Sequence, residues 1–401
     1  IEPDKHTDAN EMLCQSEAVH LFRSSLTKKN ASITSKDWKK LQDTIKHLFP
    51  NFESVVNRNR ELSKKEFQVC MLVKARFSPS EIEYIMNMKH SYATNARKRL
   101  HNTIFGYPGG AIMPVFDALY DYTRGEKKTF QHILVRHEQA AAHAAEGYAR
   151  VSGKVGVCLV TSGPGATNTL TGVADAMMDS TPLVVIAGQV GVGALGTDAF
   201  QEVDLVGLAQ PISKWSYQIR RPEDIAWAVS RAFYIAKSGR PGPVVLDFPK
   251  NAQVHTTEWQ PAKVDFVRSY VPYPEPDETA IMAAAELINN ASKPLALIGQ
   301  GVELGNANEE LAAFLEKADI PAARTLLGLS ALPTNHPLNV GMLGMHGNYA
   351  PNVKVQECDV LIAVGMRFSD RVTGLPSTFA KQAKIIHLDI DRAEINKCIH
   401  V

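Results

Sequence analysis

Glycine is missing from the first 105 residues of this 401-residue chain, although 26 glycines follow. Tight β-hairpins use glycine at positive φ, so this absence argues against hairpins in that stretch and favours helices. Cysteine is scarce as well, with no pair at metal-ligand spacing and no dense disulfide framework. The five cysteines, which we expect to be buried free thiols, are Cys14, Cys70, Cys158, Cys358 and Cys398.

Long apolar runs are also absent. No run approaches the ~20 residues that a membrane span needs, and the chain does not open with a basic region followed by an apolar export segment. We therefore expect a cytoplasmic protein. The chain begins with Ile1 rather than Met and stops at Val401 just after a strand-like run, so we expect a fragment that is cut at both ends.

The nearly neutral total charge hides an asymmetry along the chain. Residues 1–103 hold 18 Lys+Arg and 12 Asp+Glu, a net charge of +6, whereas the remaining residues hold 25 and 30, a net charge of −5. The length allows two or three domains, and 45% hydrophobic with 21% charged residues is an ordinary globular composition. We expect two pieces of different chemistry joined in one chain.

The stretch from about 62 to 103 has the layout of a helix-turn-helix. Ser63 and Glu66 form a capping box for a first helix. Residues 78–81, Ser-Pro-Ser-Glu, predict the start of a second helix, and residues 91–100 predict a third with an Arg/Lys/Asn face. In a helix-turn-helix the second helix of the motif enters the DNA major groove, so the stretch resembles the DNA-binding part of LuxR-like bacterial regulators.

DNA binding is one of two interpretations of this basic helix. The candidate DNA-binding residues are Asn95, Arg97 and Arg99. The alternative is a solvated basic helix on a helical bundle, since three helices with a basic face are common. Residues 1–60 carry no motif that points to a function.

From Phe105 to about Val271 the pattern alternates between strands and helices. Strands are predicted at 133–136, 155–160, 182–187 and 244–247, and helices at 138–151, 166–178 and 223–236. Such alternation predicts a parallel sheet covered by helices, with ligands bound at the carboxyl ends of the strands.

A proline-rich linker precedes a third segment. Pro272, Pro274 and Pro276 occupy alternate positions, which favours extended backbone and forbids helix. From Asp277 onward a helix is predicted at 277–289 and strands at 295–298, 359–364 and 384–389. This pattern predicts a second doubly wound α/β domain that is incomplete at its end.

Two turns of the second segment are candidates for ligand binding. Residues 161–168, Thr-Ser-Gly-Pro-Gly-Ala-Thr-Asn, lie between a strand and a helix, where glycine lets a ligand approach the backbone and the helix offers unpaired N–H donors. The spacing is not that of a Walker loop or a dinucleotide fingerprint, and many α/β proteins have such turns for packing alone. Glu138 lies where a strand becomes a helix, a place where the helix dipole alone favours a carboxylate.

Five motifs in register resemble the large, catalytic subunit of acetolactate synthase. They are Phe105–Pro114, Arg136–Glu138, Thr161–Asn168, Gly196–Glu202 and Gly239–Val244, and the third segment continues the series with Gly341–Gly347 and Arg367–Gly374. The resemblance covers about three quarters of the chain, from about Ile104 to the end. It implies a thiamine-diphosphate-enzyme pyrimidine-binding domain at 104–270 and a Rossmann-like, FAD-binding-like middle domain at 277–401, preceded by the all-α segment at 1–103.

The resemblance implies condensation of two 2-keto acids, such as pyruvate to 2-acetolactate in isoleucine and valine biosynthesis. In this family the glutamate that matches Glu138 hydrogen-bonds the aminopyrimidine ring of thiamine diphosphate and promotes its imino tautomer. Gly109, Pro164 and Asn168 would line the pyrimidine pocket, and Gln201 would point at the reacting carbon.

The same carry-over places the second keto acid at Phe200 and Arg371, whose guanidinium would bind the carboxylate of the keto acid. Lys250 and Asp370 would belong to the substrate pocket. The structural alternatives are a core aromatic for Phe200 and a surface salt bridge for Arg371. The matches at 199–202 and at 370–371 argue against a related decarboxylase or oxidase, because a decarboxylase lacks a pocket for a second substrate.

The family also binds FAD in its middle domain, without redox use in the main reaction. A glycine turn after one strand suits a pyrophosphate, and an acidic residue after another suits a ribose. The positions that match the surroundings of this cofactor are Arg240, Gly299, Gly301, Met345, Asp389 and Asp391.

One family feature is missing from these 401 residues. No Gly-Asp pair occurs in them, whereas the family uses Gly-Asp-Gly with a downstream Asn to bind Mg²⁺ and the diphosphate. We therefore assign no metal ligand, expect the Mg²⁺ site to lie in a missing domain, and expect this chain to be inactive alone. Ser369 stands where the family usually has Asp, and Met366 stands where a small residue is usual.

The helical segment runs straight into the first enzyme motif, which suggests that the two parts come from different genes. Family members are homodimers or tetramers and often bind a small regulatory subunit. The expected partners are therefore 2-keto acids, further copies of the chain and such a subunit. DNA is the partner in the alternative hypothesis of a transcriptional regulator, and no membrane contact is expected.

Overall fold

The computed structural model describes residues 12–13, 15–27, 33–50, 52–53, 68, 71–72, 102–124 and 129–401. The chain divides into two compact units. The smaller unit comprises residues 1–103 with 129–131 and 151–153, and the larger unit comprises the other residues. Each unit has a hydrophobic core of its own.

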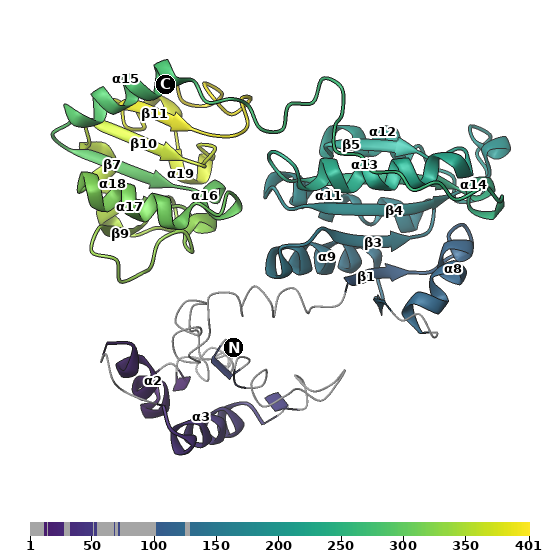
Figure 1. Cartoon of the computed structure of the whole chain (residues 1–401), viewed down its shortest axis with the longest axis horizontal. Helices are drawn as coiled ribbons and strands as arrows, with labels where there is room; N and C mark the ends of the chain where they lie inside the picture. The colour runs from purple at the N-terminus through teal and green to yellow at the C-terminus, as the bar shows by residue number, and fades with distance from the viewer. Residues whose placement is uncertain are drawn as a thin grey trace. The chain divides into compact units, whose positions relative to one another are not determined.

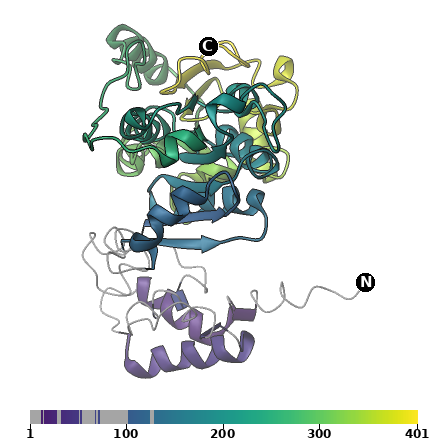
Figure 2. The same ribbon diagram turned by 90° about the vertical axis from the view of Figure 1, so that its right-hand side faces the viewer.

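The smaller unit contains the helices α2 (Glu17–Thr27) and α3 (Ser35–Leu48), drawn in purple in Figures 1 and 2. A capping box starts α3: Thr34 Oγ1 accepts a hydrogen bond from the Asp37 N–H, and the Asp37 carboxylate accepts one from the Thr34 N–H. Phe22 and Trp38 join the two helices edge to face, with ring centroids 4.8 Å apart. These elements are helical, as the lack of glycine predicts.

Most of the predicted helix-turn-helix at 62–103 lies outside the described residues. This holds for the candidate DNA-binding residues Asn95, Arg97 and Arg99. Of the first predicted helix, Gln68 and residues 71–72 are described and are helical. DNA binding stays a prediction.

Two sheets follow along the chain (Figure 1). The first has six strands in the order β2-β1-β3-β4-β6-β5. The strands are β1 (Asn102–Tyr107), β2 (Phe130–Leu134), β3 (Gly156–Val160), β4 (Leu183–Gln189), β5 (Trp215–Gln218) and β6 (Pro243–Pro249). The pairs β1–β3, β3–β4, β4–β6 and β5–β6 are parallel. The helices are α8 (Met113–Thr123), α9 (Glu138–Ser152), α10 (Pro164–Thr167), α11 (Leu170–Met178), α12 (Leu205–Ala209), α13 (Ile225–Lys237) and α14 (Lys250–Val254). Because the strand order reverses between β1 and β3, their carboxyl ends form the switch point at which such sheets bind ligands.

The second sheet has five strands in the order β11-β10-β7-β8-β9, and all four neighbouring pairs are parallel. Its strands are β7 (Pro294–Ile298), β8 (Ala322–Arg324), β9 (Asn339–Met342), β10 (Val360–Val364) and β11 (Lys384–Leu388). Its helices are α15 (Glu278–Asn289), α16 (Gly301–Leu304), α17 (Asn308–Ala318), α18 (Tyr349–Glu357) and α19 (Asp370–Thr373). This is the Rossmann order, with a switch point between β7 and β10, and it confirms the prediction of two parallel α/β sheets.

The structure corrects several predicted boundaries. The helix predicted at 166–178 is broken after Thr167 into α10 and α11. The strand predicted at 133–136 is β2 and ends at Leu134, and the edge strand β5 was not predicted. None of the helices in the described part of the chain is long and apolar enough to cross a membrane.

Candidate active site

Two glycine-containing turns meet at the carboxyl ends of β1 and β3. Tyr107 of β1 lies beside Val160 of β3 in the sheet, so the turns that follow them leave the same edge. A Cβ atom on Gly109 would lie 2.5 Å from the Cβ of Thr161, which is far below any normal contact. Glycine at position 109 therefore allows the two turns to approach each other.

Glu138 lies at this edge, at the start of α9, and is only 8% exposed. The Asn168 side-chain amide donates a hydrogen bond of 2.9 Å to Glu138 Oε2. A Cβ atom on Gly165 would lie 3.5 Å from Glu138 Oε1 and 2.7 Å from Thr161 Cγ2. Two of the predicted residues, Glu138 and Asn168, are thus in direct contact, and the glycine turns enclose the carboxylate.

One buried polar atom at this place lacks a partner. Thr161 Oγ1 is buried and has no hydrogen-bond partner among the described residues. A buried hydroxyl without a partner is costly, and a polar ligand group beside it would remove that cost. Cys158 on β3 is fully buried, and burial together with the charge of Glu138 raises the pKa of its thiol. Cys158 is therefore a neutral core residue and no nucleophile.

Gln201 and Phe200 lie on the loop between β4 and α12. A Cβ atom on Gly163 would lie 2.7 Å from the carbonyl oxygen of Gln201, so this loop packs on the turn that holds Pro164. Phe200 is 87% exposed, which rules out the structural alternative of a core aromatic. The Gln201 backbone therefore lies against the turn of residues 161–168, which also contacts Glu138, and the Phe200 ring is accessible to a ligand.

The other residues predicted for the substrate pocket are exposed. The Arg371 guanidinium lies 3.6 Å from the Asp370 carboxylate at the start of α19, and their side chains are 70% and 74% exposed. The surface ion pair proposed as the structural alternative is thus present, although an exposed pair of this kind is weak and leaves the guanidinium free to bind a carboxylate. Lys250 begins α14 and is exposed.

A cleft of about 790 Å³ is lined by apolar side chains, glycine turns and three arginine side chains, one of which is Arg371. It contains four of the six predicted FAD-binding positions, namely Arg240, Gly299, Gly301 and Asp389. The Gly299 and Gly301 turn follows β7 and lies against Gly365 at the end of β10, where added Cβ atoms would lie 2.2 and 2.6 Å from Gly365 atoms. This is the switch point of the second sheet, the place where a doubly wound sheet receives a pyrophosphate.

Acidic side chains hold Arg240 in this cleft. The Arg240 guanidinium donates hydrogen bonds to Asp391, at 3.1 Å, and to Glu394, at 2.7 Å. Burial raises the pKa of the Asp389 carboxyl. Met345 is 62% exposed and does not line the cleft.

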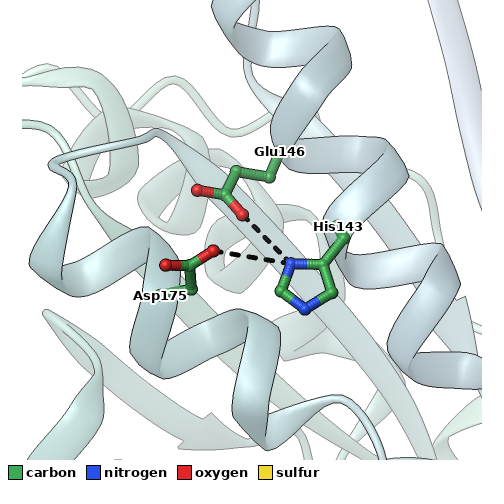
Figure 3. A group of neighbouring side chains, drawn as sticks. All are labelled: His143, Glu146 and Asp175. Carbon is green, nitrogen blue, oxygen red and sulfur yellow. Dashed lines mark hydrogen bonds and ion pairs between the residues drawn. The ribbon is translucent and has the colours of Figure 1, made fainter. Parts of the chain in front are cut away.

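A cluster of titratable side chains joins α9 to α11 and was not predicted (Figure 3). His143 Nδ1 lies 3.4 Å from Glu146 Oε2 and 3.5 Å from Asp175 Oδ2. Arg150 donates hydrogen bonds to Glu146 at 2.9 Å and to Asp179 at 2.7 Å, and so neutralises the buried Glu146 carboxylate. Burial and the neighbouring Glu146 raise the pKa of Asp175.

Asp247 on β6 is a buried carboxyl that was also not predicted. Its Oδ2 accepts hydrogen bonds from the side-chain amides of Gln218, at 2.6 Å, and Gln189, at 3.4 Å. Burial raises its pKa to about 6 despite these bonds. An aspartate inside the apolar run of β6, Pro-Val-Val-Leu-Asp-Phe-Pro, was the available signal for this group.

Two protein-family models match the chain. Residues 86–208 match the thiamine pyrophosphate enzyme N-terminal TPP binding domain, and residues 281–401 match the thiamine pyrophosphate enzyme central domain. The first match begins inside the stretch 62–103 that was assigned to the helix-turn-helix.

Similar proteins are acetolactate synthase large subunits. The "probable acetolactate synthase large subunit" of Methanocaldococcus jannaschii is 52% identical over 298 residues, which cover 73% of this chain and 49% of that protein. The acetolactate synthase isozyme 2 large subunit of Escherichia coli is 50% identical over 296 residues, 74% of this chain and 52% of that protein. The chain thus spans about half the length of the relatives that it matches.

Proposed function

We propose that the chain serves the thiamine-diphosphate-dependent condensation of two 2-keto acids. Over about three quarters of its length it is homologous to acetolactate synthase large subunits. It also contains the N-terminal and central domains of thiamine pyrophosphate enzymes. The buried Glu138 carboxylate, bonded to Asn168 between glycine turns, is the observation that carries this proposal.

The surroundings of Glu138 fit an aminopyrimidine ring. The ring is flat and polar at its edge, and the turns at Gly109 and Gly165 leave no room for further side-chain atoms beside Thr161. The unpartnered Thr161 hydroxyl would gain a hydrogen-bond partner from a polar ring edge. Glu138 would hold a proton of the ring, and Asn168 orients the carboxylate for it.

Thiamine diphosphate, when bound, supplies an electron sink for the decarboxylation of a 2-keto acid. The residues of this chain then position the reactants. Gln201 would face the reacting carbon, Phe200 would cover the second keto acid, and Arg371 would bind the carboxylate of that keto acid through its planar guanidinium. Lys250 and Asp370 complete the proposed substrate pocket.

We also propose that the cleft at the β7–β10 switch point binds FAD. Its volume of about 790 Å³ falls in the range of cofactor sites. The glycine turn of Gly299 and Gly301 would receive the pyrophosphate, Arg240 would add positive charge, and Asp389 would accept from the ribose. Asp391 would act through Arg240, whereas Met345 lies outside the lining of the cleft.

The diphosphate and Mg²⁺ have no assigned residues in this chain, which contains no Gly-Asp pair. We therefore propose that these 401 residues bind the pyrimidine end of the cofactor. A second copy of the chain and a small regulatory subunit are the proposed protein partners, with pyruvate or another 2-keto acid as substrate.

Thiamine has the aminopyrimidine ring without the diphosphate, so its binding tests whether the Glu138 carboxylate holds that ring. By saturation-transfer NMR we expect the chain to bind thiamine with a Kd on the order of 1 mM, and Glu138→Gln to weaken binding about tenfold because the charge-assisted bond is lost. Glu258→Gln, an exposed carboxylate far along the sequence, is the control. Equal thiamine binding by the wild type and Glu138→Gln would remove the role given to Glu138.

Activity can be tested after the C-terminal half of the Escherichia coli relative is joined behind Val401. We expect this extended protein to form acetolactate from pyruvate, and Glu138→Gln to lower kcat by about 10² to 10⁴. Unchanged turnover in Glu138→Gln would refute the proposed chemistry.

A further inference from the structure

The loop that carries Phe200 and Gln201 has an unusual backbone. Between β4 and α12, φ is positive at Gly196 (77°), Asp198 (56°) and Gln201 (61°). Positive φ is strained for residues with a side chain, and two of these three are not glycine. Phe200 is exposed and cannot hold the loop by burial. The loop therefore needs another source of order.

Glu202 supplies that order through its carboxylate. One oxygen accepts a hydrogen bond from the Gly196 N–H, and the other accepts one from the Ala199 N–H at 3.1 Å. Backbone N–H groups of Gly196, Ala199, Thr197 and Asp198 lower the pKa of the Glu202 carboxyl. Converging backbone N–H groups form an anion-binding nest, and here the anion is the side chain of the same loop.

Further contacts fix the ends of this ring of residues 196–202. The Glu202 N–H donates to the Ala199 carbonyl at 2.8 Å, which closes the ring from inside. At its base, the Gln189 amide donates to the Val203 carbonyl at 2.8 Å. On its outer side, Gln201 packs on Gly163, where an added Cβ would lie 2.7 Å from the Gln201 carbonyl oxygen. The carboxylate thus sets the backbone at the two residues that face the reaction.

We propose that Glu202 is a positioning residue, whose carboxylate fills the 196–199 nest and thereby holds Phe200 and Gln201 in place for the second keto acid. This inference rests on the proposed function for the roles of Phe200 and Gln201. Glu202 itself touches neither substrate nor cofactor in this proposal.

Removing the anion and restoring it from solution tests the proposal on the full chain. In Glu202→Ala we expect hydrogen exchange of the 196–199 amides to accelerate about tenfold, because bonds to a charged acceptor are lost. Formate, a small carboxylate, should refill the nest and slow that exchange again. Glu202→Gln keeps one acceptor oxygen and loses the charge, so its exchange should lie between those of the wild type and Glu202→Ala, without a response to formate.

A fluorine label reports on the positioned side chain. With 4-fluorophenylalanine at position 200, we expect one sharp ¹⁹F resonance in the wild type, a shifted or broadened one in Glu202→Ala, and a return of the first signal with formate. Glu258→Ala, with or without formate, should match the wild type. Hydrogen exchange of β4 and β6 in the same experiment shows whether the variant is folded.

The outcomes separate this proposal from the proposed function. Unchanged exchange and fluorine signal in a folded Glu202→Ala, or a change that formate does not reverse, would overturn the positioning role. Thiamine binding should stay within about twofold of the wild type in Glu202→Ala, because the Glu138–Asn168 bond lies outside the nest. Loss of thiamine binding in this variant would contradict a role confined to the loop, whereas a wild type without thiamine binding would overturn the proposed function.

Discussion

A methyl group added at Gly109 tests whether the pyrimidine site depends on the close approach of the turns that follow β1 and β3. In Gly109→Ala the new Cβ would lie 2.5, 2.6 and 2.7 Å from Thr161 Cβ, Cγ2 and Oγ1, whereas ordinary contacts begin at 3.4 Å. Rotating the Thr161 side chain cannot relieve this, because its Cβ is fixed to the backbone. The turns after β1 and β3 must therefore move apart by about 1 Å, since packed atoms resist closer approach.

This movement sets the expected magnitudes. Overpacking of this kind lowers the free energy of unfolding by about 1–3 kcal/mol. A displacement of about 1 Å beside Glu138 can cost about 10²-fold in function, so thiamine binding should fall below detection. Gly110→Ala is a matched control, because a Cβ on the adjacent Gly110 meets nothing within 4 Å.

Urea denaturation followed by tryptophan fluorescence measures the stability, and saturation-transfer NMR measures the binding of thiamine. We expect Thr161→Gly to restore part of the stability of Gly109→Ala, because it removes all three contacting atoms, which gives a favourable coupling in the double-mutant cycle. If Gly109→Ala and Gly110→Ala were equally stable and bound thiamine equally well, the reasoning from the close approach would be refuted.

Two further predictions concern buried charges. The raised pKa of Asp247 means that its protonated form favours the folded state. This contribution to the free energy of unfolding, about 3 kcal/mol, is present below pH 4 and is lost as the pH rises to about 6. Asp247→Asn should remove this pH dependence of the free energy of unfolding, measured by urea denaturation, and a pH dependence that persists in the variant would belong to another group. Arg150→Met leaves the buried Glu146 carboxylate without its guanidinium and should lower the free energy of unfolding by about 3 kcal/mol, measured by thermal unfolding. Arg221→Met breaks an exposed pair and should leave the stability nearly unchanged. Equal losses in the two variants would contradict the role of burial.

The predicted strands in the middle of the first sheet were correct because their residues are apolar on both faces. All seven residues of β6 are buried, as are six of seven in β4, and this is typical of a parallel sheet covered on both sides. The edge strand β5 has four half-buried residues, Trp-Ser-Tyr-Gln, and no such run. The break between α10 and α11 was missed because Ala166, Leu170 and Val173 keep a helical spacing across it, although Asn168 and Thr169 are themselves weak helix formers.

The sequence motifs predicted Glu138, Asn168 and Gln201 as site residues, and the structure adds the contact of Glu138 with Asn168 and the bonds that Glu202 makes in the loop of Gln201. The Glu202 carboxylate can bind the loop's backbone N–H groups only because positive φ at Gly196 and Asp198 turns these groups toward it. The sequence does not predict such a loop conformation. The hydrogen bonds of Asp247 likewise could not be predicted from the sequence. They come from the side-chain amides of Gln189 on β4 and Gln218 on β5, which the strand order β4-β6-β5 places on either side of β6.

The two halves of the candidate site are held by different physical means. Glu138 is buried at the head of a long helix between glycine turns, so its position depends on packing and changes only if the sheet edge moves. Phe200 and Gln201 lie on an exposed loop that is closed by one charge, so their position depends on hydrogen bonds that solvent can replace. In the proposed function, this difference would let the cofactor ring stay fixed while substrates enter and products leave past the loop. Substitutions at Glu202 should therefore alter the loop and spare the pyrimidine site, whereas substitutions at Gly109 should disturb the pyrimidine site first.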